Sequence, residues 1–148
     1  MVAEGYRARE RLFADVIMAA QTLKSRLRFY KDTLSCAVKE CRSQCSPHAG
    51  AMLDAYCAAI DSGVAEAGGA LEDCLPELTL SARERAALCA FLQGLGRSDA
   101  HGQHEHLTAC ELTFRDFLQE SAAQRRRFAS MYVKLGFSAG LLLVILLV

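Results

Sequence analysis

Apolar residues recur every three or four positions over most of the chain, which is the spacing of one face of an α-helix. The first such segment extends from Tyr6 to Ser46 and contains neither glycine nor proline. A single helix of about ten turns is therefore predicted there. Its apolar residues form one stripe: Leu12, Val16, Ala19, Leu23, Leu27, Tyr30, Leu34, Val38 and Cys41.

Start and stop signals divide the rest of the chain into further helices. Ser46-Pro47 provides a cap and a first helical residue, and the helix that follows fades at Asp61-Ser62-Gly63. A short, weaker helix is predicted from Val64 to Leu75, with Pro76 as its end.

Two more helices complete the pattern. Ser81 and Glu84 form a capping box before an apolar run that stops in Gly94–Asp99, where Ser98 or Asp99 can cap the last helix. The apolar stripe of this helix continues without a breaker to Tyr132. We therefore predict an all-α bundle of about five to six helices, with long first and last helices, the last continuing into a C-terminal membrane segment.

The end of the chain has the composition of a membrane segment. After Lys134 come fourteen uncharged residues, about 21 Å as a helix, which is short of the roughly 30 Å of a hydrocarbon core. Tyr132 suits the interface, and Lys134 can extend its ammonium to it. Arg125, Arg126, Arg127 and Lys134 are expected at the membrane surface on the cytoplasmic side. The predicted parts are a cytoplasmic helical bundle, residues 1–131, and a transmembrane segment, residues 132–148.

Composition alone excludes two classes of protein. With 52% apolar and 23% charged residues the chain is not disordered, and a formal net charge of zero disfavours a basic nucleic-acid binder. The charges are nevertheless unevenly distributed: nine basic and four acidic residues lie between Arg7 and Arg42, four and twelve between Ser43 and Gln124, and four basic residues with no acid beyond. This distribution predicts that Arg7, Arg9 and Arg11 lie level with the C-terminal arginines at one membrane face.

Cysteine and histidine are the only residue types that suggest chemistry. Seven cysteines without a signal peptide indicate a reducing compartment. Cys36, Cys41, Cys45 and His48 form one candidate metal cluster, and His101, His104 and His106 form another, but neither has the spacing of a zinc site. No catalytic motif is present, so we predict neither an enzyme, a cofactor nor a metal site. A Cys/His domain that responds to metal or redox state remains an alternative.

One local pattern carries a resemblance. Leu95-Gly96 is followed by Asp99, Gln103 and His106, and the chain ends in the apolar segment Tyr132–Val148. In both features the sequence resembles the stage III sporulation protein AB family, which in turn is similar to the cytoplasmic domain of type II secretion F proteins.

The resemblance implies a non-catalytic scaffold in the channel apparatus between mother cell and forespore. Implied partners are membrane lipid, a cytoplasmic ATPase and other channel subunits, with a possible homo-oligomer and no nucleic acid; the implied location is the mother-cell-side membrane. Gly96, Asp99, Gln103 and His106 would hold an interhelical turn or an interface. The family's N-terminal membrane helix is missing, and Met1–Tyr6 looks like its tail. The alternative is a tail-anchored helical adaptor of an unrelated pathway.

Overall fold

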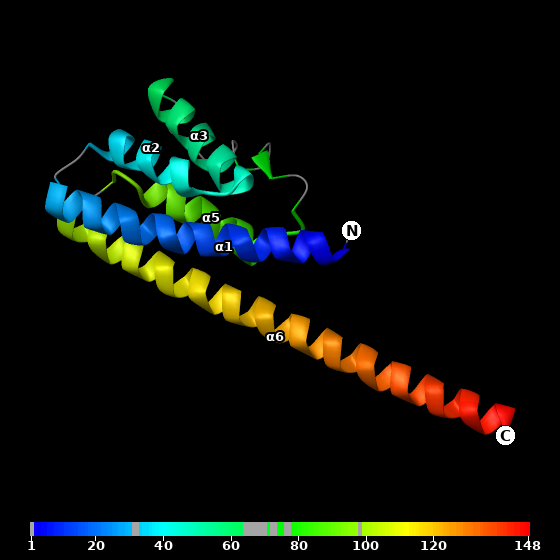
Figure 1. The fold of residues 1–148 in the computed structure, drawn as a ribbon. Helices are drawn as coiled ribbons and strands as arrows, with labels where there is room; N and C mark the ends of the chain where they lie inside the picture. The colour runs from blue at the N-terminus through cyan, green and yellow to red at the C-terminus, as the bar shows by residue number, and fades with distance from the viewer. Residues whose placement is uncertain (1, 31–32, 64–70, 72–73, 76–77, 98) are drawn as a thin grey trace. The chain divides into compact units, whose positions relative to one another are not determined.

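The computed structural model describes residues 2–30, 33–63, 71, 74–75, 78–97 and 99–148. These residues form five α-helices and one π-helical turn, and none of them is in a strand (Figure 1). The predicted all-α fold with long first and last helices is confirmed. The elements are α1 (Val2–Ser25), η1 (Arg26–Tyr30), α2 (Leu34–Gln44), α3 (Pro47–Asp61), α5 (Ala82–Gly94) and α6 (Ala100–Leu147).

The chain divides into two compact units, Met1–Leu118 and Gln119–Val148. The first unit contains the helical bundle with the beginning of α6, and the second contains the remainder of that helix. The boundary of the membrane segment at residue 132 remains a prediction.

The single helix predicted over Tyr6–Ser46 is wrong. The chain forms α1 and η1, and α2 then begins after Thr33, whose extended backbone (φ −66°, ψ 145°) is that of an N-cap. The hairpin packs the stripe of α2 against α1, and the Sγ of Cys41 lies 3.9 Å from the carbonyl oxygen of Ala19. In a single straight helix the apolar stripes of α1 and α2 could not have packed against each other. Periodicity does not detect the break, because both helices keep the same apolar spacing.

The other predicted boundaries agree with the structure. Ser46 is the N-cap of α3 and Pro47 its first residue, and α3 ends at Asp61. The capping box at the start of α5 is present: the Ser81 amide donates to Glu84 Oε2 (2.8 Å) and the Glu84 amide donates to Ser81 Oγ (3.3 Å). The helix predicted over Val64–Leu75 falls largely outside the described residues.

An aromatic cluster occupies the centre of the first unit, where α1, α5 and α6 meet (Figure 1). The ring of Phe114 lies 5.8 Å from Phe13, 6.4 Å from Phe91 and 5.7 Å from Phe117, measured between centroids. All four side chains are at most 2% exposed. Helices α2 and α3 add their buried faces to the same core through Ala37, Val38, Cys41, Ala49, Met52, Leu53 and Tyr56.

Two buried carboxylates connect the helices of the first unit. Glu84 accepts hydrogen bonds from the Nε (3.1 Å) and Nη2 of Arg9, which joins α5 to α1. Glu111 accepts from Lys24 Nζ (2.6 Å) and Gln21 Nε2 (2.9 Å), which joins α6 to α1. The hydrogen bond from Lys24, followed by that from Gln21, lowers the pKa of Glu111, so the carboxylate stays ionised near neutral pH.

Candidate functional site

The turn between α5 and α6 brings together the four residues of the sequence motif. Gly96 has φ +78°, a conformation that favours glycine because a Cβ would be strained there. Asp99 caps α6: its Oδ1 accepts from the Gly102 amide (3.0 Å) and its carbonyl accepts from the Gln103 amide (2.9 Å). These two residues lie where the chain reverses and where α6 begins.

Gln103 and His106 reach back from α6 to the end of α5. Gln103 Nε2 donates to the Gly94 carbonyl (2.8 Å), and His106 Nε2 lies 3.2 Å from the Phe91 carbonyl. Since a carbonyl only accepts, the contact assigns the ring proton of His106 to Nε2. The last carbonyls of a helix have no partner within it, so both side chains satisfy groups that would otherwise be unpaired.

Two residues that the sequence did not single out complete this arrangement. The Tyr56 hydroxyl on α3 donates to the Leu95 carbonyl (3.2 Å), and burial raises the pKa of Tyr56 to about 12. Gly94 leaves room for the imidazole of His106: a Cβ at residue 94 would overlap that ring. In the sequence, Gly94 indicates only the end of a helix.

Gly94→Ala is expected to displace His106 from the Phe91 carbonyl and to lower the free energy of unfolding by about 1–3 kcal/mol. His106→Ala is expected to have a similar effect, because the same carbonyl loses its donor. The double variant should lose clearly less stability than the two single variants together. Alanine in place of His106 leaves room for the methyl group of alanine at residue 94. Chemical unfolding of the four proteins measures this, and additive costs would show that the two residues do not interact.

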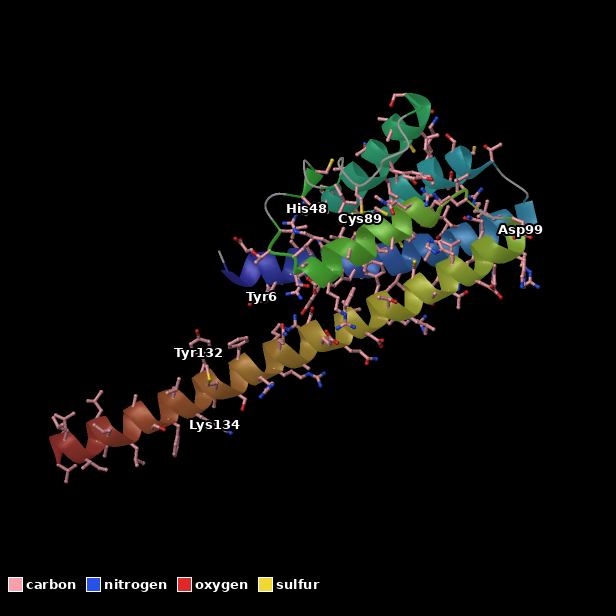
Figure 2. The ribbon with its side chains drawn as sticks, turned by 180° about the vertical axis from the view of Figure 1, so that it is seen from behind. Tyr6, His48, Cys89, Asp99, Tyr132 and Lys134 are labelled. Carbon is pink, nitrogen blue, oxygen red and sulfur yellow. The ribbon has the colours of Figure 1, made fainter. Side chains whose placement is uncertain are left out.

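The predicted membrane-surface residues all lie on α6 in the second unit. Arg125, Arg126, Arg127 and Lys134 are exposed, and the side chains of Tyr132 and Lys134 project from the helix in Figure 2. Large apolar side chains from Phe128 to Val148 are at least 49% exposed. Helix α6 is long and apolar enough to cross a membrane, and its most apolar stretch is not buried at all.

The two candidate Cys/His clusters do not gather into a metal site, although the Sγ of Cys110 lies 3.7 Å from Nε2 of His106. Among the residues that the structure describes, no three His, Cys, Asp or Glu side chains are placed to hold one metal ion. Cys41 is buried, Cys36 is exposed, and His101 and His104 are exposed on α6. Burial raises the pKa of the Cys41, Cys45 and Cys110 thiols to about 11, and these therefore remain protonated and weakly nucleophilic.

Comparisons with known proteins agree with this fold. The family described as "Stage III sporulation protein AB" matches residues 1–148. A solved structure, "Stage III sporulation protein AB (SpoIIIAB)", is similar with a TM-score of 0.63 and 20% sequence identity, over 78% of this chain and 94% of that one. At this identity the likeness shows a shared fold alone. No curated protein sequence matches the chain.

Proposed function

Because the chain belongs to the stage III sporulation protein AB family, which gives it a role in sporulation, we propose that it is a membrane-anchored platform without catalytic activity. It would serve the channel apparatus between mother cell and forespore, in the mother-cell-side membrane, where the bundle engages a cytoplasmic ATPase and other channel subunits. The anchor would be the C-terminal part of α6, and the bundle would lie in the cytoplasm.

A single observation carries this proposal. One continuous helix, α6, begins among the buried residues of the bundle and ends in an exposed apolar segment. Phe114 and Phe117 on this helix are buried in the core, whereas Leu146 and Leu147 are 81% and 77% exposed. Exposed apolar surface of this extent is costly in water and favourable in lipid. A helix without a break between bundle and anchor suits a subunit that holds a protein surface at the bilayer.

The arginines support a cytoplasmic location for the bundle. Arg125, Arg126 and Arg127 directly precede the apolar segment, and each basic residue near an anionic leaflet gains about 1 kcal/mol. Lipid headgroups are therefore part of the proposed set of partners. Cys41 and Cys110 are buried and their thiols have a raised pKa, which makes these two poor redox sensors, since such sensors need accessible thiolates.

Flotation of membranes from sporulating cells tests the anchor. Leu141→Arg combined with Ile145→Arg places two charges in the apolar segment, each costing about 2.5–3.5 kcal/mol near the centre of a membrane helix. The intact chain should float with the membranes and the double variant should not. Leu112→Arg is the matched control, because Leu112 is 57% exposed on α6 within the first unit, and it should float. Flotation of the double variant would disprove the anchor.

Purification of the full chain from sporulating cells in mild detergent tests the platform. We expect the cytoplasmic ATPase or other channel subunits to copurify. They should also copurify when an unrelated transmembrane helix replaces residues 132–148, since the bundle would make the contacts. Recovery of the intact chain without any of these subunits would contradict the platform role while leaving the anchor intact.

A further inference from the structure

A groove of about 700 Å³ lies in the first unit, between the end of α1 with η1 and the start of α6. Asp99, labelled in Figure 2, marks this end of α6. Leu27, which is partly buried, and Leu107, which is fully buried, provide apolar lining.

The residues that line the groove and are charged at neutral pH are basic. Lys24, Arg28, His101 and His104 line it, and none of the described lining residues is acidic. His101 has an ion pair with Glu105 (3.3 Å), but both side chains are more than 70% exposed, so this pair contributes little. The groove is therefore complementary to a carboxylate held beside an apolar group.

Lys24 is held in place at the groove. Its ammonium donates to Glu111, which Gln21 also binds, and the lowered pKa of Glu111 keeps that carboxylate charged. An ammonium group has three donors, so two remain after this bond for a second acceptor. The adjoining residues Arg26–Tyr30 form a π-helical turn, a feature that often occurs at functional sites.

We propose that this groove binds a short segment of a partner subunit in which an aspartate or glutamate stands beside a leucine- or phenylalanine-sized side chain. The carboxylate would contact Lys24 and Arg28, and the apolar side chain would cover the exposed part of Leu27. The inference rests on the platform role proposed above, because a groove for a subunit presupposes that subunits assemble on this chain.

Photo-crosslinking in sporulating cells tests the proposal. A photoreactive amino acid replaces His101, whose side chain is 82% exposed, in the full chain, and the crosslinked peptides are sequenced by mass spectrometry. We expect a segment of another subunit with an acidic residue within four positions of a large apolar one. Arg28→Glu and, separately, His104→Glu should reduce the adduct at least about tenfold, because like charges in contact cost several kcal/mol. Lys39→Glu makes the same charge change as Arg28→Glu at an exposed position on α2 outside the groove and should leave the adduct unchanged.

The other outcomes would overturn the proposal. These are an adduct with lipid, with a second copy of this chain or with a segment that lacks acidic residues, or an adduct that both charge reversals leave unchanged. Copurification from the same cells separates the two proposals. If the subunits copurify but residue 101 gives no adduct with them, the groove is excluded and the platform stands. If no subunit copurifies, the platform fails and the groove fails with it.

Discussion

Replacing Phe114 with alanine is expected to lower the free energy of unfolding by about 3–5 kcal/mol, the usual cost of removing a fully buried aromatic ring. The side chain is 0% exposed and lies within 6.4 Å of three other phenylalanine rings, counted between centroids. These rings come from α1, α5 and α6, so a cavity at residue 114 weakens the aromatic contacts of α6 with both other helices. Pulse proteolysis of the detergent-solubilised full chain across a urea series measures the change.

Leu112→Ala provides the matched control for this truncation. Leu112 lies two residues earlier on the same helix, and 57% of its surface is exposed. A change within about 0.5 kcal/mol is expected there, because little apolar surface is buried. Equal costs at both positions would mean that the cluster of phenylalanines does not stabilise the bundle.

Most of the core could be predicted from the sequence, because a stripe of apolar residues on a helix has to be covered by other parts of the protein. Leu12, Val16, Ala19 and Leu23 were assigned to such a stripe, and all are at most 2% exposed. The reversal between α1 and α2 could not be predicted, since no glycine or proline marks it. What determines it is tertiary: Cys41 and its neighbours on α2 are buried against α1 only when the chain turns back.

The motif at the α5–α6 turn was recognisable in the sequence, but its geometry was not. Spacing places Asp99, Gln103 and His106 on one segment. The acceptors of Gln103 and His106, the carbonyls of Gly94 and Phe91, depend on how α5 packs against α6. The contribution of Tyr56 comes from a third helix, almost forty residues earlier in the chain. Such contacts have no local signature, and we propose that the motif as a whole holds this turn.

The expected membrane face needs one revision. Arg9 was grouped with Arg7 and Arg11 as a residue that faces lipid, but its side chain is 15% exposed and paired with Glu84. The distribution of charges along the sequence could not reveal this, because it does not show whether a basic residue contacts a lipid headgroup or a buried carboxylate. The level alignment of the N-terminal and C-terminal arginines remains a prediction.

Glu84→Gln is expected to destabilise the bundle by about 3–5 kcal/mol, because it leaves the guanidinium of Arg9, whose side chain is only 15% exposed, without a counter-charge. Glutamine can still accept from the Ser81 amide, so the capping box is kept and the change isolates the ion pair. Glu84→Ala also removes the acceptor of the Ser81 amide, which is half of the capping box, and should lower the free energy of unfolding by about 1 kcal/mol more. Urea unfolding of each full-length variant gives these differences.

The double variant Arg9→Met with Glu84→Gln tests whether the ion pair makes a net contribution to stability. The alternative is that its attraction only offsets the cost of removing both charges from water. Methionine fills most of the arginine's volume, so the charge is removed while the contact with Phe13, whose ring centroid lies 5.7 Å from the guanidinium, keeps an apolar partner. We expect the double variant to recover most of the stability lost in Glu84→Gln, because no charge then remains buried. If the double variant instead loses as much stability as Arg9→Met and Glu84→Gln lose together when measured singly, Arg9 and Glu84 are not energetically coupled. In that case the cost of Glu84→Gln does not come from the ion pair with Arg9.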